Sequence, residues 1–171
     1  MKYILSIIAI VLVAVAFLTP TSAMAQGNPD NALLFTFNVL SNLGTSAFNG
    51  GIGAKHFIDN NTAVVGSFGY SSTAGDVDET SVTLGLQNYC GEFTGNGVNA
   101  FYGFEGSYGY TGATEVSTYG VGAFVGAEVF VLKNTSLGAE YGVGYTTDSV
   151  GGNESFSVGS QSGQFTLAFY F

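Results

Sequence analysis

The sequence contains very few positive charges. Its 171 residues include 3 lysines and arginines against 12 aspartates and glutamates, which gives a formal net charge of −9. Proteins that bind nucleic acid neutralise its phosphates with lysine and arginine side chains. The shortage of these side chains therefore excludes a nucleic-acid-binding protein.

Side chains that cross-link or ligate are also scarce. Cys90 is the single cysteine, so the chain cannot form an intrachain disulfide, and we expect Cys90 to be a small packing residue. His56 is the single histidine, and neither a calcium-binding loop nor a nucleotide-binding glycine motif occurs. We therefore expect no cofactor and no metal site.

Helical patterns are missing from most of the chain. No segment after residue 26 shows an extended 3.6-residue periodicity or an apolar run long enough to span a membrane as a helix. The chain instead has 26 glycines, 15 phenylalanines and 10 tyrosines, a composition that favours strands joined by turns. An exported chain of this kind can still occupy a membrane as a closed β-barrel.

The N-terminal segment predicts export. A basic lead is followed by an almost unbroken apolar run from Ile4 to Leu18 and by an Ala-x-Ala pattern that ends at Ala25. This arrangement is typical of a secretory signal peptide, and the run is shorter than the roughly 20 residues that a spanning helix needs. We predict a cleaved signal peptide at 1–25 and a single barrel domain at 26–171.

Eight segments after the signal peptide have the alternation and length of barrel strands, which need roughly nine to eleven residues each. They predict an all-β fold, an eight-stranded antiparallel up-and-down transmembrane β-barrel. The strands are expected at 32–40, 50–58, 63–72, 80–90, 99–111, 117–132, 136–147 and 162–171.

The predicted connections alternate in length. The polar turns at 59–61 and 133–135 are tight, and the turn at 91–98 is the exception on that side. Outer-membrane barrels have short periplasmic turns and longer outer loops, and an even strand number places both termini of the barrel domain on the periplasmic side. The longer connections, expected to be the outer loops, are 41–49, 73–79, 112–116 and 148–161.

One face of the later strands is apolar, and the other is mostly glycine with an occasional acid. In 117–132, Val121 and Val125 share one face, while Gly122, Phe124 and Glu128 share the other. A soluble sandwich or lipocalin-like barrel would turn its apolar face inward and show many charges to water. The pattern favours an apolar face against lipid and a narrow, partly polar lumen.

Three segments resemble parts of the small outer-membrane β-barrel proteins, the OmpX-like proteins and the membrane domain of OmpA-type proteins. These segments are Gly50–Ile58, Ala63–Tyr70 and the closing strand that ends at Phe171. The similarity covers essentially the whole chain after the signal peptide and implies a bacterial outer-membrane location. Family members commonly carry interior arginines and lysines, which are nearly absent here.

The resemblance also implies an assembly signal in the closing strand. Alternating apolar residues that end in a terminal aromatic resemble the signal read by the barrel-assembly machinery. The residues at these positions are Phe165, Leu167, Phe169 and Phe171.

Four charged residues are expected on the inward face: Lys55, Glu105, Glu128 and Glu140. A hairpin centred on Asn134 would place Glu128 and Glu140 directly opposite each other, where two carboxylates repel unless a proton or a cation intervenes. We predict that Lys55 bridges to Glu128 or Glu140, with Glu105 nearer the outer rim. We favour a network that holds the barrel closed over an ion-conducting gate, because side chains just fill the interior of eight strands.

Catalysis is not expected. Some eight-stranded barrels act on lipid A, which requires a serine nucleophile within reach of a histidine base. His56 lies near a periplasmic turn, whereas its best partner pair, Asp148-Ser149, lies in a loop at the opposite rim. These groups cannot meet, so we predict no enzymatic activity.

The outer loops are expected to be acidic and solvated. Their acidic residues are Asp76, Asp78, Glu79, Glu115, Asp148 and Glu154. We therefore predict a non-enzymatic outer-membrane barrel with a structural or surface-interaction role through these loops. Its expected partners are outer-membrane lipid, lipopolysaccharide and, during biogenesis, the barrel-assembly machinery, and we expect a monomer. Alternatives are a minor pore for ions or very small solutes, and a secreted soluble β-barrel or sandwich binder.

Overall fold

The computed structural model covers most of the chain after the predicted signal peptide. It describes residues 30–38, 48–73, 77–91, 93–94, 97–112, 114–151, 153–160 and 163–171. The predicted signal peptide at 1–25, most of the predicted loop at 41–49, and Asp76 lie outside these residues. No helix among the described residues is long and apolar enough to cross a membrane.

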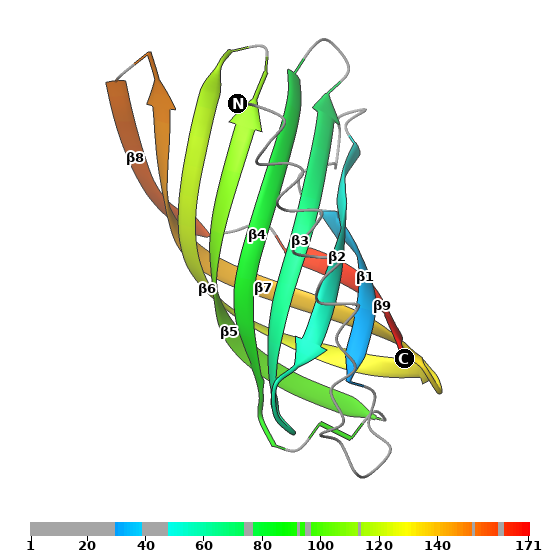
Figure 1. Cartoon of the computed structure of the whole chain (residues 1–171). Helices are drawn as coiled ribbons and strands as arrows, with labels where there is room; N and C mark the ends of the chain where they lie inside the picture. The colour runs from blue at the N-terminus through cyan, green and yellow to red at the C-terminus, as the bar shows by residue number, and fades with distance from the viewer. Residues whose placement is uncertain are drawn as a thin grey trace.

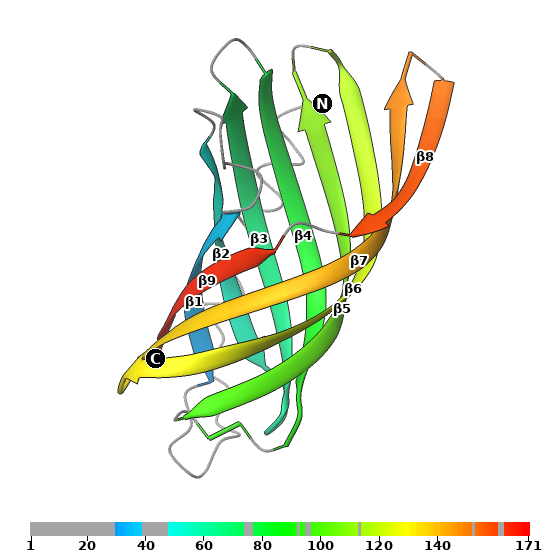
Figure 2. The ribbon, with the colours of Figure 1, turned by 180° about the vertical axis from the view of Figure 1, so that it is seen from behind.

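The described residues form a closed antiparallel sheet (Figure 1). Each strand from β1 to β7 pairs with the next along the chain, and β9 pairs with both β7 and β1. Figure 2, the view from behind, shows β9 in front, beside β7. The predicted eight-stranded up-and-down barrel is therefore confirmed, including the pairing of its last strand with its first. The strands are β1 Asn31–Asn38, β2 Phe48–Phe57, β3 Thr62–Thr73, β4 Val77–Tyr89, β5 Val98–Thr111, β6 Val116–Leu132, β7 Thr135–Val150, β8 Asn153–Ser160 and β9 Gln164–Tyr170.

The eighth stave of the barrel is made of two pieces, β8 and β9, which both pair with β7. Val143 pairs with Ser160 and Glu140 pairs with Gln164, so this stave has one residue more than β7 over the same stretch. The alternation of outward residues is therefore shifted by one position between β8 and β9. Exposed Phe156 and Val158 in β8 thus share the outer face with Phe165 and Phe169 in β9.

The prediction of a long loop at 148–161 is wrong. The chain continues as strand to Val150 and, after a turn that includes Gly151, returns as β8 from Asn153. Serine and glycine suggested a loop, but they alternate with Phe156 and Val158 and occupy the inward positions of a hairpin. The predicted loop at 73–79 is also shorter, because β3 reaches Thr73 and β4 begins at Val77.

The two ends of the barrel differ in their connections. We call the turn end the one that holds the turns at 58–61 and 133–134, together with the connection at 90–97 and Phe171. There the backbones of Asn31 and Phe171 exchange hydrogen bonds of 3.3 and 3.0 Å, which closes the barrel at the ends of β1 and β9. We call the opposite end, where Gly112, Glu115 and Gly151 lie, the loop end.

The two faces of the barrel wall differ as the alternation predicts. On β6, Val121 and Val125 on the outer face are each 62% exposed, whereas Glu128 on the inner face is 2% exposed. In the middle of the strands, the four charged residues are on the inward face, and large apolar residues occupy the outer one. The buried core is therefore the lumen itself, and its contents decide what the protein can do.

Candidate functional site: the barrel lumen

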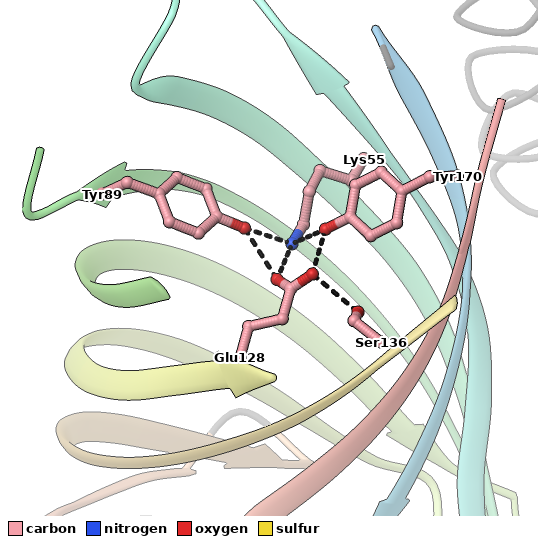
Figure 3. Close-up of polar contacts among 5 residues, drawn as sticks. All are labelled: Lys55, Tyr89, Glu128, Ser136 and Tyr170. Carbon is pink, nitrogen blue, oxygen red and sulfur yellow. Dashed lines mark hydrogen bonds and ion pairs between the residues drawn. The ribbon is translucent and has the colours of Figure 1, made fainter. Parts of the chain in front are cut away.

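The ammonium group of Lys55 lies in the lumen and donates three hydrogen bonds (Figure 3). The acceptors are the Tyr89 hydroxyl at 2.7 Å, the Glu128 carboxylate at 2.9 Å and the Tyr170 hydroxyl at 3.1 Å. A lysine ammonium has three N–H donors, so all of them are used. Of the two acceptors predicted for Lys55, the structure brings Glu128 to it.

Glu128 is the centre of this group of five residues, which we call the lumen network: Lys55, Tyr89, Glu128, Ser136 and Tyr170. Its carboxylate accepts hydrogen bonds from the Ser136 hydroxyl at 2.6 Å, from the Tyr89 hydroxyl at 2.8 Å and from the Tyr170 hydroxyl. Buried charges are tolerated when they are paired and fully hydrogen-bonded. The network meets both conditions and joins β2, β4, β6, β7 and β9.

The prediction that Glu128 and Glu140 face each other is wrong. Glu128 pairs with Gly138, and Glu140 pairs with Gly126, because a register shift between Phe130 and Leu132 displaces the hairpin. Glu140 therefore lies farther from the turn end, where it accepts a hydrogen bond of 3.1 Å from the Gln164 carboxamide. This register shift, a β-bulge, separates the carboxylates of Glu128 and Glu140 along the barrel axis. They are therefore not the directly opposed pair whose repulsion the sequence predicted.

An aromatic residue that sequence reasoning missed closes the turn end. Phe93 belongs to the connection at 90–97, yet it is 1% exposed and its backbone N–H bonds to the Asn60 carbonyl at 3.1 Å. Its ring centroid lies 4.6 Å from that of Phe57 and 4.7 Å from that of Tyr89. Tyr170 and Phe130 complete this cluster, at 5.5 and 5.6 Å from Phe93.

We call this cluster the aromatic plug: Phe57, Tyr89, Phe93, Phe130 and Tyr170. The sequence signal was a lone aromatic in a connection of otherwise small and polar residues. Such a residue becomes buried when the connection folds back over an open barrel end. The plug lies beneath the lumen network, with which it shares Tyr89 and Tyr170.

A cavity of about 290 Å³ lies on the other side of the lumen network. Lys55 and Glu128 line part of it, and Glu105, Glu140 and Gln87 line the rest together with apolar and hydroxyl side chains. Glycine leaves room for the aromatic walls: a Cβ at position 103 would come within 2.3 Å of the Phe124 ring. The predicted inward face of Glu105 and Glu140 thus becomes the wall of a defined cavity.

The acidic residues predicted for the outer loops are mostly in strands. Glu79 lies in β4, Asp148 in β7 and Glu154 in β8, while Glu115 occupies the turn between β5 and β6. Asp148 accepts a hydrogen bond of 2.6 Å from the Thr118 hydroxyl. These residues lie toward the loop end, as does the backbone of Asp78 near the start of β4.

Three candidates remain: His56 and Cys90 near the turn end, and the Asp148-Ser149 pair near the loop end. His56 is partly buried and bonds through Nδ1 to the Asn31 side chain at 2.9 Å. The Asp148-Ser149 pair is near the opposite end of the barrel, so the structure does not bring a histidine and a serine together there. Cys90 is exposed just beyond β4, so its predicted packing role is wrong.

Comparison with solved structures identifies the fold. The chain is similar to the N-terminal β-barrel domain of OprF from Pseudomonas aeruginosa, with a TM-score of 0.54 and 10% identity over 84% of this chain and 99% of that one. The resemblance to small outer-membrane β-barrels is thereby confirmed at the level of the fold.

Two further structures are similar at lower scores. They are the outer-membrane protein OprG from Pseudomonas aeruginosa and AlkL in lipid bilayers, with TM-scores of 0.41 and 0.42 and identities of 10% and 13%. They cover 84% and 88% of this chain, and 94% and 92% of their own. No protein-family model and no curated protein sequence matches the chain.

Proposed function

We propose that this protein is an integral β-barrel of a bacterial outer membrane, with a structural or surface-interaction role and no catalytic activity. The observation that carries the proposal is the arrangement of side chains in the barrel wall, with apolar residues on the outer face and charged residues on the inner face. Large apolar residues such as Phe104 and Val121, each 62% exposed, lie outside, whereas Lys55 and Glu128 are buried inside. A soluble binder would require the opposite arrangement, because water favours charge outside and apolar groups inside.

The size of the apolar surface supports a lipid environment. Exposed apolar side chains occur on every stave of the ring, from Phe37 on β1 to Phe169 on β9. Soluble monomers rarely expose a contiguous apolar surface of more than a few hundred Å². Strands β3 to β7 have 12 to 17 residues, which is enough to cross the bilayer with a tilt.

The proposed orientation places the turn end in the periplasm and the loop end outside the cell. The predicted signal peptide and the even number of staves favour this orientation. Glu79, Glu115, Asp148 and Glu154 would then give the outer end a negative charge. We propose that this end meets lipopolysaccharide and its associated cations, that the protein is a monomer, and that the closing strand is read by the barrel-assembly machinery.

The lumen favours a structural role over conduction. The aromatic plug and the lumen network occupy the turn end of the described lumen, and Phe93 is almost completely buried there. An ion would have to pass through the packed aromatic rings and displace the Lys55–Glu128 ion pair, whose hydrogen-bonding groups are already used. In planar bilayers we therefore expect no discrete conductance steps, and reproducible steps over repeated insertions would favour the pore alternative.

The location is tested by membrane fractionation with proteolysis of intact cells. We expect the protein in the outer-membrane fraction, migration in detergent gels that changes on boiling, and cleavage confined to the loop end. Extraction from cells without detergent would contradict the outer-membrane proposal. Cleavage at 58–61 or 133–134 in intact cells would reverse the proposed orientation.

A further inference from the structure

The carboxylate of Glu140 lies in the lumen cavity and forms no ion pair with a lysine of the described chain. This carboxylate bonds to the neutral Gln164 carboxamide at 3.1 Å. Lys55 lines the same cavity, but its three N–H groups are all donated to the lumen network. The other lysine of the described residues, Lys133, lies in the exposed turn at the end of the barrel. Glu105, a second carboxylate, also lines the cavity.

A buried amide points to a ligand independently of this charge. Gln87 is 4% exposed and lines the cavity, and its carboxamide is accessible from the cavity and makes no hydrogen bond to another described residue. A buried polar group without a partner is costly, so such groups generally pair with solvent or a bound molecule. Gln87 and Glu140 therefore offer acceptor oxygens to whatever fills the space.

The walls of the cavity favour an organic cation over a metal ion. No cluster of three or more metal-ligating side chains occurs among the described residues. The rings of Phe101 and Phe124, 6.2 Å apart and edge to face, form part of the lining beside Leu34. Aromatic faces attract ammonium groups, and apolar walls accept a short alkyl chain.

The size of the cavity sets the size of the ligand. Its volume is about 290 Å³, compared with the roughly 150 Å³ of an engineered cavity that binds benzene. A small alkylammonium ion fits such a space, whereas a peptide or sugar chain does not. Entry is from the loop end, since the aromatic plug closes the turn end.

We propose that the lumen cavity binds a small organic ammonium ion. Glu140 and Gln87 accept hydrogen bonds from its N–H groups, Glu105 adds negative charge, and the alkyl part packs against Phe101 and Phe124. This site requires only the interior of the folded barrel and does not depend on where the protein lies in the cell. It can therefore be tested in micelles, separately from the proposed function.

The test is calorimetric titration of the purified, folded protein with n-butylammonium chloride at constant ionic strength. We expect saturable binding by the wild type and little binding of neutral n-butanol. Glu140→Gln should weaken binding about tenfold or more, because a charge-assisted hydrogen bond is lost. Gln87→Leu should weaken it about threefold or more, because the hydrogen bond from the ammonium to an uncharged acceptor is lost. Glu115→Gln removes the same charge in an exposed turn and should leave binding unchanged.

Each other outcome overturns the proposal. Absence of butylammonium binding shows that the cavity holds only water or a proton. Equal binding of n-butanol shows an apolar cavity without charge recognition. Equal loss in Glu115→Gln shows a nonspecific charge effect, and displacement by calcium at lower concentration shows a metal site. Migration in detergent gels reports whether each variant is folded. If Glu140→Gln fails to fold, the proposal is tested by comparing the binding of butylammonium and butanol to the wild type.

Discussion

The ammonium of Lys55 on β2 lies 2.9 Å from the carboxylate of Glu128 on β6, although the two residues are separated by 73 positions in the chain. The two strands are on opposite sides of the eight-stave ring, so the pair spans the lumen. Both side chains are almost completely buried. The ion pair therefore ties together walls of the barrel that share no backbone hydrogen bonds.

Removing one partner of this pair should destabilise the barrel. Lys55→Met leaves the buried Glu128 charge without its cation and should lower the free energy of unfolding by about 3 kcal/mol. The loss is measured by urea unfolding in micelles. Lys133→Met, in an exposed turn, is the matched control and should change stability little. If Lys55→Met is as stable as the wild type, or more stable, the ion pair does not hold the barrel closed.

The double variant sharpens this test. Glu128→Gln in the Lys55→Met background removes the unpaired negative charge of Glu128 while keeping a side chain of similar size. It should recover part of the stability lost in the single variant, because the penalty comes from an uncompensated charge. Additive losses in the double variant would indicate that packing and not charge explains the first result.

Phe93 should contribute strongly to stability even though it lies in a connection. Phe93→Ala opens a cavity in the aromatic plug and should cost about 3–5 kcal/mol, the range for buried aromatic residues. Phe156→Ala makes the same chemical change at a side chain that is 76% exposed, and should cost less than about 1 kcal/mol. Equal effects of the two substitutions on urea unfolding would contradict the burial of Phe93.

The turn at 58–61 should make stability depend on pH. The pKa of Asp59 is held below its ordinary value of 3.8 because its carboxylate accepts hydrogen bonds from the Asn61 and Thr62 backbone N–H groups, at 2.9 and 2.7 Å. A depressed folded-state pKa adds stability above the unfolded pKa, and that stability is lost as pH falls through the folded pKa.

Asp59→Asn tests this directly, because an asparagine oxygen accepts the same hydrogen bonds but does not titrate in this range. The difference in stability between the wild type and Asp59→Asn should be largest near neutral pH and should decline once the pH falls below 3.8. A constant difference from neutral to strongly acidic pH would show that ionisation of Asp59 does not contribute.

Deletion of Phe171 should impair assembly in cells more than folding in micelles. Phe171 exchanges backbone hydrogen bonds with Asn31, and the residue is 58% exposed. The folded fraction is measured in outer-membrane preparations by migration in detergent gels, and again after refolding of the purified chain. Phe156→Ala serves as the control for losing an exposed aromatic. Normal assembly of the truncated chain in cells would refute an assembly signal at this position.

Strand positions could be predicted from the sequence because the alternation of side chains is local. The predicted strands at 99–111 and 117–132 differ by a single residue from β5 and β6. The predicted inward positions of Lys55 and Glu128 follow from the same period of two. The prediction failed at 148–161, where serine and glycine suggested a loop although Phe156 and Val158 kept the alternation of a strand.

The arrangement within the lumen could be predicted only in part. The bulge near Leu132 shifts the register of β6 against β7, and no local pattern marks it. The burial of Phe93 depends on a barrel end of suitable width, and the cavity beside Gln87 depends on side chains from several staves. These features arise from contacts between residues that are distant in the sequence.

The amino-acid sequence by itself determined an all-β barrel with apolar residues outside and a few charged residues inside, since residue type and alternation act over neighbouring positions. Only the tertiary structure decided which carboxylate Lys55 meets, what closes the turn end and where a cavity remains. The reason is geometric: closure of the ring sets the register of each strand, and a shift of one residue changes which side chains meet across the lumen.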